Sequence, residues 1–363
     1  MKYIDEFRNK KLIQRLAQDI FGIMPKSRVK LMEVCGTHTQ NFRRFGLGEL
    51  LPENLSLVSG PGCPVCVSAP GYIDAALRLA RDKNNIILTF GDMLCVPGNK
   101  SSLIEARAEG NKISVVYSAL GSLEVARKNP EKKVIFLAVG FETTAPTIAL
   151  SILAAAKEKI RNLYFFSALK LIPPAMKYLL GDKRLQLDGF LCPGHVSAVI
   201  GAKAYAFIAR QYKIPCCVTG FEPLDILEGI YLLLQQIVSG RPRVANQYLR
   251  AVKNAGNRQA QQMMARVFRV ADDQWRGMGE IAQSGLKIKR EFSGFDAEKA
   301  FGINSVTLSL SAVSQKCRCG EILKGLIAPQ QCPLFGKACR PEHPLGPCMV
   351  SSEGTCNAHY RYR

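Results

Sequence analysis

Apolar residues occur in short runs that alternate with helix-like segments through most of the first 240 residues. Each run ends in a turn that is rich in glycine or cysteine or that carries a charged residue; the runs are 29–34, 55–58, 86–90, 134–139, 164–169, 190–191 and 216–219. Strands that alternate with helices in this way predict parallel sheets. Functional groups gather at the carboxyl ends of the strands in such sheets, and most of the unusual residues of this chain stand there.

Both ends of the chain follow other patterns. Residues 1–25 predict an amphipathic helix that ends before Pro25, and residues 241–285 show helical spacing without a strand run. The last 45 residues are rich in Gly, Pro and Cys, so a metal site would have to replace an apolar core there. We therefore expect an α/β protein with two parallel-sheet lobes that face a cleft, residues 1–120 and 121–240, and a mainly helical, loop-rich C-terminal domain, residues 241–363.

Composition and charge narrow the class of protein. The 363 residues are 47% hydrophobic and 21% charged, and no apolar run is long enough to span a bilayer. The first residues lack the features of a signal peptide, so we expect a soluble, cytoplasmic protein. The net charge of +20 is scattered along the chain and comes without a zinc-finger or RNA-recognition signature. It favours a solvated surface or an acidic protein partner over nucleic acid or membrane.

Cysteine is the strongest chemical signal. There are 13 cysteines, and six of them lie in the last 47 residues. Because cytoplasmic thiols tend to stay reduced, this density indicates metal binding or redox chemistry rather than disulfide staples. The chain has no phosphate-binding glycine loop, dinucleotide fingerprint or serine hydrolase elbow.

The first candidate site is Cys35-Gly36-Thr37-His38-Thr39, directly after an expected strand. A thiol and an imidazole three residues apart at the start of a helix can meet at one point. The helix N-terminus is expected to lower the pKa of the thiol. Cys35 and His38 then form a nucleophilic pair or a pair of metal ligands. The alternative is a buried cysteine followed by helix-capping residues.

The second candidate site is Gly60-Pro61-Gly62-Cys63-Pro64-Val65-Cys66. The spacing of Cys63 and Cys66 permits a disulfide within one turn or two ligands to one metal, and Pro64 restricts the loop as in redox-active dithiols. Neighbouring cysteines are also expected to lower the thiol pKa. Two structural cysteines or half of a zinc site are the alternatives.

Two further turns carry polar groups. Glu142 follows a strand and can orient a ligand, accept a proton or hydrogen-bond a cysteine, whereas Thr143 and Thr144 are equally typical of helix capping. His195 follows the tight turn Pro193-Gly194 and is expected at an exposed loop. A lone histidine is more often structural than catalytic.

The C-terminal residues offer six thiols: Cys317, Cys319, Cys332, Cys339, Cys348 and Cys356. A cubane iron–sulfur cluster needs four thiolates. The wide, irregular spacing lacks the C-x-x-C pairs of the usual structural zinc sites, although a zinc site stays the alternative.

Taken in order, these motifs resemble the HypD family along essentially the whole chain. The matching segments are CGTHT at 35–39, GPGCPVC at 60–66, GFETTAPT at 140–147, PGHVSAVIG at 193–201, CPLFGKAC at 332–339 and GPCMVSSEGTC at 346–356. The resemblance implies a role in the maturation of [NiFe] hydrogenases. In that family the protein and the small partner HypC form a scaffold on which an Fe(CN)2CO unit is built. HypE delivers the cyanide, with HypF upstream, and the finished unit passes to the hydrogenase large-subunit precursor.

The resemblance also implies roles for residues. Cys35 is expected to hold the transient iron together with a cysteine of HypC, with His38 beside it, and Cys63 and Cys66 are expected to be the thiol–disulfide pair. A [4Fe–4S] cluster is expected in the C-terminal domain, with the ligands Cys319, Cys332, Cys339 and Cys356 and the alternates Cys317 and Cys348. A cyanide-delivery cleft between the lobes is expected to be lined by Glu142, Thr143, Thr144 and His195.

An electron relay is our hypothesis for the chemistry. A soft thiolate can hold low-spin Fe(II) with its cyanide and carbonyl ligands, and release of cyanide from a thiocyanate requires electrons because the carrier sulfur leaves as a thiolate. Electrons would pass from the cluster to Cys63 and Cys66 and then to the iron site at Cys35. Two other hypotheses are a general iron–sulfur-dependent thiol–disulfide oxidoreductase and a zinc-stabilised binding module.

Overall fold

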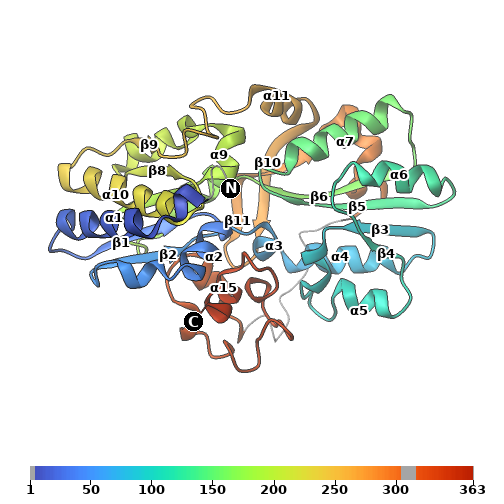
Figure 1. The fold of residues 1–363 in the computed structure, drawn as a ribbon. Coiled ribbons are helices and arrows are strands. Elements are labelled where there is room, and N and C mark those ends of the chain that lie inside the picture. Colours follow the sequence, from blue (N-terminus) through green and yellow to red (C-terminus); the bar gives the residue numbers. More distant parts are fainter. Residues whose placement is uncertain (1–4, 304–315, 363) are drawn as a thin grey trace.

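Two α/β lobes and a cysteine-rich tail make up the computed structural model, which describes residues 5–303 and 316–362 (Figure 1). The first lobe is built on a parallel sheet of five strands: β2 (Leu55–Ser59), β1 (Val29–Glu33), β7 (Gly189–Pro193), β8 (Cys216–Thr219) and β9 (Val244–Asn246). The second lobe is built on a sheet of six: β10 (Phe268–Trp275), β11 (Gly279–Ile288), β6 (Leu163–Lys170), β5 (Lys133–Gly140), β3 (Asn85–Thr89) and β4 (Ile113–Val115). Only the β10–β11–β6 edge of this second sheet is antiparallel.

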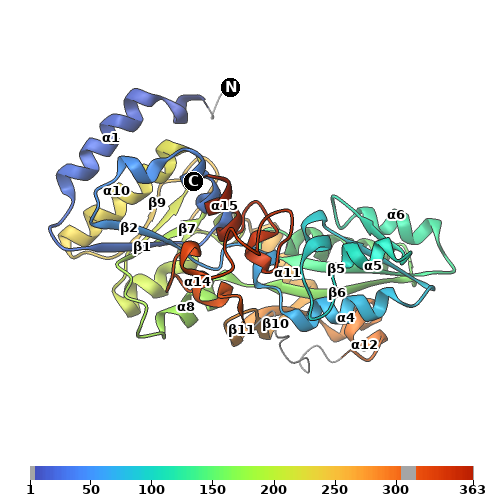
Figure 2. The same cartoon turned by 90° about the horizontal axis from the view of Figure 1, so that it is seen from below.

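Helices cover the faces of both sheets. In the first lobe, α10 (Pro223–Ser239) packs on β7 and β8, and α1 (Lys10–Ile23) lies outside α10 (Figure 2). The first lobe also holds α2 (Gly36–Arg44) and α9 (Gly194–Ile200), while α8 (Ile172–Leu180) packs against β11. The helices of the second lobe are α4 (Pro70–Ala80), α5 (Leu103–Ala108), α6 (Gly121–Lys128), α7 (Ala145–Lys157), α11 (Arg258–Val267) and α12 (Ala297–Ala300). None of the helices within the described residues combines the length and the apolar character needed to cross a membrane.

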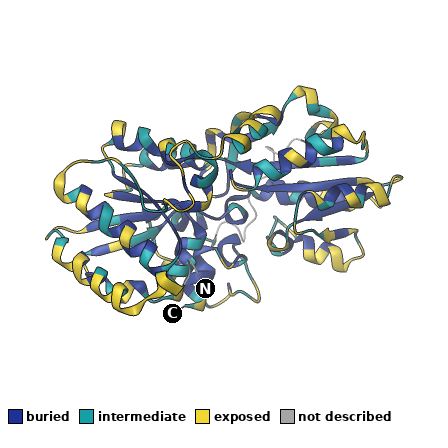
Figure 3. Cartoon of the chain, turned by 45° about the horizontal axis from the view of Figure 1, so that its top comes forward, coloured by how far each residue is buried: buried dark blue, intermediate teal, exposed yellow. Residues whose placement is uncertain are grey.

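Burial explains why the apolar runs form central strands. All residues of β3 and seven of the eight residues of β5 are buried, as expected for parallel strands with helices on both faces. In Figure 3 the central strands of both lobes are buried, whereas the outer turns of the helices are exposed. The seven strands expected from the apolar runs are confirmed. The helix expected over residues 1–25 is confirmed over Lys10–Ile23 as α1, which begins after the cap residue Asn9, and residues 1–4 lie outside the described residues.

The sheets do not follow consecutive stretches of the chain, and in this respect the expected division at residue 120 is wrong. Strands β1 and β2 belong to the first sheet, whereas β3 and β4 belong to the second, and the chain returns to the first sheet only at β7. Residues 241–288 are not purely helical either, because they form β9, β10 and β11. Strand β10 is buried only at its two end residues, and polar residues interrupt its apolar ones, so its sequence lacks the apolar run that marks a buried strand.

The cysteine-rich tail, residues 316–362, lies between the two lobes (Figures 1 and 2). Its short helices are α14 (Cys319–Leu323) and α15 (Thr355–Arg361), with the single turns η7 (Pro329–Gln331) and η8 (Pro347–Met349). Helix α15 packs against α2, and η8 packs against the short helix α3 (Pro64–Val67). The tail therefore contacts the segments that carry both internal cysteine motifs.

Candidate functional site

The two internal cysteine motifs meet at the carboxyl end of the first sheet. Cys35 is the N-cap residue of α2, and Cys63 is the N-cap residue of α3. The Gly36 N–H donates to the carbonyl oxygen of Gly62 at 3.1 Å. A Cβ on Gly62 would lie 2.4 Å from the Cα of Cys35. Only glycine permits this approach, so the Gly60-Pro61-Gly62 turn has a packing role beside Cys35.

Glu353 of the tail is a site residue that the sequence interpretation missed. The Thr37 hydroxyl donates to Oε1 of Glu353 at 2.7 Å. A Cβ on Gly36 would lie 2.3 Å from the backbone oxygen of Glu353. Glu353 is more than 300 residues from Cys35 in the chain, and no spacing rule connects the two positions.

The expected low pKa of Cys35 is wrong for the free thiol. Burial, followed by the negative charge of Glu353, raises the pKa of Cys35 to about 12. Backbone N–H groups of Thr37 and His38 act in the expected, lowering direction, but they are outweighed. Without a metal, Cys35 is therefore a protonated thiol at neutral pH.

His38 is buried as a neutral ring. Its Nε2–H donates to the carbonyl oxygens of Gly220 at 2.8 Å and Thr219 at 3.2 Å, and burial lowers its pKa to about 4. Because carbonyls only accept, the proton resides on Nε2 and the lone pair on Nδ1. Nδ1 is buried and has no hydrogen-bond partner among the described residues.

His195 lies in the same group of rings as His38. Both imidazoles contact the ring of Phe221. The centroid of the Phe221 ring lies 4.8 Å from that of His38 and 4.0 Å from that of His195. His195 is exposed as expected, but it stands in the first turn of α9 and not in a loop, and the charge of Glu353 acts on it. The structure therefore groups His195 with His38 and Glu353.

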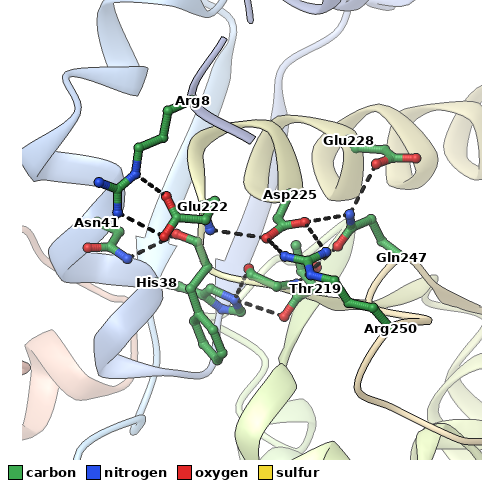
Figure 4. A network of polar contacts seen from close by, with 11 residues as sticks. Arg8, His38, Asn41, Thr219, Glu222, Asp225, Glu228, Gln247 and Arg250 are labelled. Atoms are coloured by element: carbon green, nitrogen blue, oxygen red, sulfur yellow. Dashed lines mark hydrogen bonds and ion pairs between the residues drawn. The ribbon is translucent and has the colours of Figure 1, made fainter. Parts of the chain in front are cut away.

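A polar network fixes the β8–α10 turn that carries Phe221 (Figure 4). Glu222 pairs with Arg8 of the N-terminal turn η1 (Asp5–Arg8), and the Asn41 amide donates to the Phe221 carbonyl at 2.9 Å. The fully buried Asp225 pairs with Arg250 at 2.5 Å. These contacts hold the carbonyl groups that orient His38.

Cys63 and Cys66 form a buried pair. The Cys66 N–H donates to the sulfur of Cys63 at 3.3 Å, and the two residues are 3% and 0% exposed. Burial, followed by contacts with the thiols of Cys348 and Cys63, raises the pKa of Cys66 well above its ordinary value. The expectation that its neighbours lower the pKa is therefore wrong for Cys66.

The six tail thiols line one pocket. Its other walls are mostly apolar; the lining is Cys317, Cys319, Cys332, Cys339, Cys348, Cys356, Ile322, Leu334, Phe335, Gly346 and Met349. The thiol of Cys348 interacts with the thiols of Cys66, Cys319 and Cys356. Contact between the tail thiols and the pair Cys63–Cys66 thus passes through Cys348. All 13 cysteines are free thiols in the structure.

The donor set of this pocket fits an iron–sulfur cluster. Within the described ranges, no three His, Cys, Asp or Glu side chains are arranged around a position for a metal ion. A cubane cluster is held by four thiolates at its separate iron corners, so its ligands surround a pocket instead of converging on one point. The four expected ligands and both alternates line this pocket. The choice of four among the six stays a prediction.

The remaining candidates lie at the end of β5 in the second lobe. Oε1 of the buried Glu142 accepts from the Ile172 N–H at 2.9 Å, and burial raises the pKa of Glu142 to about 7. Thr144 is the N-cap residue of α7 without a side-chain cap bond. Thr143 and Thr144 line an open pocket together with Pro64 and Val65 of α3. These threonines thus lie beside the cysteine pair, apart from His195.

Known proteins resemble the chain over its full length. The family model HypD, described as "Hydrogenase formation hypA family", matches residues 10–363. The proteins named hydrogenase maturation factor HypD of Azotobacter vinelandii and Cupriavidus necator are 44% and 43% identical to it, over 100% of this chain and 97% of each relative. The protein of the same name from Escherichia coli is 42% identical over 100% of this chain and 98% of the relative. The chain therefore belongs to the HypD family.

Proposed function

We propose that this chain is a maturation factor for [NiFe] hydrogenases and a scaffold, with HypC, for assembly of the Fe(CN)2CO unit. HypE is the proposed cyanide donor, with HypF upstream, and the hydrogenase large-subunit precursor is the proposed recipient. The observation that carries the proposal is the position of the tail. Glu353 bonds Thr37 beside Cys35, and Cys348 contacts Cys66. One segment thus touches an iron-binding candidate and a redox candidate.

Cys35 is the proposed ligand of the iron cargo. Its thiol must lose a proton when iron binds, and the resulting thiolate suits low-spin Fe(II) with cyanide and carbonyl ligands. Glu353, whose charge acts on Cys35, is the proposed acceptor of that proton. The neutral His38 offers a buried, unpartnered Nδ1 on the same helix. Cys35 and His38 are therefore the groups that bind and orient the cargo.

Cys63 and Cys66 are the proposed source of two electrons for cyanide release. Oxidation of two thiols to a disulfide yields two electrons and two protons. Two electrons also convert a thiocyanate into a thiolate and cyanide, so the two half-reactions balance. Thr143 and Thr144, which share a pocket with Pro64 and Val65, are proposed to orient the incoming group.

The tail thiols are the proposed holders of a resident [4Fe–4S] cluster. Cys319, Cys332, Cys339 and Cys356 are the proposed ligands, with Cys317 and Cys348 as alternates. When bound, the cluster supplies single electrons. The apolar lining of the pocket excludes water from these thiols, and the contact of Cys348 with Cys66 links the pocket to the cysteine pair.

Infrared spectroscopy of the anaerobically purified protein, co-expressed with HypC and the cyanide-delivery proteins, tests the proposal. Bands in the cyanide and carbonyl stretching regions are expected in the wild type. They should disappear in Cys35→Ala and persist in the matched control Cys95→Ala, a half-buried thiol outside both sites. Cys63→Ala should retain the cluster but lose cyanide loading. A brown wild-type protein without these bands would contradict the scaffold role.

Burial separates this proposal from a general thiol–disulfide oxidoreductase. Such an enzyme presents an accessible, low-pKa thiol to its substrates. Here Cys63 and Cys66 are 3% and 0% exposed, and the pKa of Cys66 is raised by burial. A pair enclosed in this way favours a dedicated partner over free substrates.

A further inference from the structure

Arg276 is a buried cation that neither the motifs nor the proposed function uses. Arg276 lies in the turn between β10 and β11, two strands that Figure 1 shows between the two lobes. It is 8% exposed. Its Nε–H donates to the Ser68 carbonyl at 2.7 Å, and Nη2 donates to the Pro97 carbonyl at 3.0 Å. These neutral partners satisfy hydrogen bonds, but they do not balance the charge.

Arg276 forms no ion pair with a carboxylate within the part of the chain that the structure describes. Burial lowers the pKa of Arg276, and the largest opposing effects come from the thiols of Cys319, Cys317, Cys348 and Cys66. Burial of an arginine without an anion is costly, and buried charges are almost always paired. The surroundings of Arg276 therefore supply an anion only when these sulfurs are thiolates.

The backbone holds Arg276 between the two thiol groups. Its own N–H donates to the Val67 carbonyl at 2.9 Å, next to Cys66 in the chain. On the other side, a Cβ on Gly277 would lie 2.3 Å from the Cα of Gly320, which follows Cys319. Arg276, Cys317 and Cys319 also line the same open hollow, of about 740 Å³. These two backbone contacts hold the Arg276–Gly277 turn between the two thiol groups, and the hydrogen bonds to Ser68 and Pro97 orient the guanidinium.

We propose that Arg276 is a positioning residue that acts as the fixed counter-charge of the thiolate-bound iron–sulfur centre and holds its reduction potential up. This inference rests on the cluster of the proposed function. Reduction of the centre by one electron, for example from dithionite, makes or breaks no bond and adds one negative charge. A fixed positive charge nearby stabilises the reduced form more than the oxidised form.

The first measurement is the potential of the cluster in the full-length loaded protein, followed by electron paramagnetic resonance during a dithionite titration. Arg276→Gln should lower the equilibrium constant for one-electron reduction by tenfold or more, about 59 mV. Arg276→Lys keeps the charge and should stay close to the wild type. Arg318→Gln is the matched control, because Arg318 lines the same hollow but pairs with Glu321 and is 40% exposed.

The second measurement separates a charge effect from a merely structural one. Arg276 lacks an anion before loading and has one afterwards, so Arg276→Gln should reduce the increase in Tm that accompanies cluster loading. A structural role would lower the Tm of the loaded and unloaded forms by the same amount. Arg276→Met, which keeps the apolar stem, repeats both measurements if the glutamine variant does not accumulate.

The outcomes distinguish this inference from the proposed function. A wild-type protein that binds no iron–sulfur cluster overturns the proposed cluster itself. A loaded Arg276→Gln variant with the same potential as Arg318→Gln overturns the role of Arg276 alone. An equal fall in Arg276→Lys and Arg276→Gln also overturns it, because the charge would then not be the cause.

Discussion

The Cys35 site and the tail pocket use thiols in opposite surroundings. Cys35 is a single thiol among polar groups, with Thr37, Glu353 and the ring of His38 around its loop. The tail pocket has six thiols, mostly apolar walls and one buried cation at its edge.

This difference indicates two kinds of binding. A lone thiol beside a carboxylate can exchange its proton for a metal and take it back, which suits cargo that must leave. A closed set of thiols with a fixed counter-charge gains most from a permanently bound group. The proposed iron cargo at Cys35 is therefore expected to leave, and the proposed cluster of the tail pocket is expected to stay.

The largest expected effect is loss of the proposed cluster from the tail pocket alone. Cys319→Ser should remove most of the brown colour and the bound sulfide, because serine is a poor ligand for a cluster. Cys35→Ser should leave both unchanged, since Cys35 does not line the tail pocket. Iron and sulfide analysis with visible absorption measures the result. Equal losses in both variants would contradict two independent sites.

A second prediction concerns Glu142, the buried acid of the second lobe. Its pKa is about 7 in the folded protein and about 4.5 when unfolded, so the folded state loses stability as the pH rises from about 4.5 to about 7. Glu142→Gln removes this loss and should raise the free energy of unfolding by about 3 kcal/mol at pH 8, with little effect near pH 4.5. Denaturant titrations at both values measure it.

The control for Glu142 is the exposed Glu131. Glu131→Gln should change stability equally, and only slightly, at both pH values. Stabilisation by Glu142→Gln that did not depend on pH would show that burial of the charge is not the cause.

The sequence predicted the strands well because each central strand is buried on both faces. It failed for β10, which lies at the sheet edge and is buried only at its two end residues. The order of the strands in each sheet could not be predicted from the sequence either, because the pairing of β1 with β7 joins residues about 160 positions apart. Periodicity records which face is buried and not which strand lies alongside.

In the candidate site, too, some residues could be predicted from the sequence and others could not. Cys35, Cys63 and the tail cysteines were found because their residue types carry chemistry by themselves. Glu353 and Arg276 were not found, because a glutamate and an arginine are ordinary surface residues until tertiary packing places them beside thiols. The direction of the Cys35 pKa shift depended on the same packing.

A third prediction tests the close approach that joins the two internal motifs. Gly62→Ala would place a Cβ 2.4 Å from the Cα of Cys35, so the free energy of unfolding should fall by about 1–3 kcal/mol. Gly22→Ala in α1 is the control, because a Cβ there meets nothing within 4 Å. It should stabilise the helix by about 0.5–1 kcal/mol. A neutral Gly62→Ala would show that the loops separate easily.

The smallest expected effect concerns the charge of Glu353 on the Cys35 thiol. Glu353 raises the pKa of Cys35, so Glu353→Gln should lower it and increase the thiolate fraction at pH 8. Alkylation of Cys35 by iodoacetamide, followed by peptide mass spectrometry, should then be a few-fold faster. The amide oxygen of glutamine can still accept the hydrogen bond from Thr37.

Thr37→Val separates the charge from that hydrogen bond. It removes the bond to Glu353 but keeps the carboxylate, so it should not accelerate alkylation as Glu353→Gln does. In both variants the rate should still rise with pH up to the pKa of the thiol, because only the thiolate reacts. If both variants accelerate alkylation equally, looser packing rather than charge controls Cys35. The polar groups around Cys35 would then shield the thiol from solvent without changing its pKa. Cys35 and the tail thiols would differ only in their access to solvent.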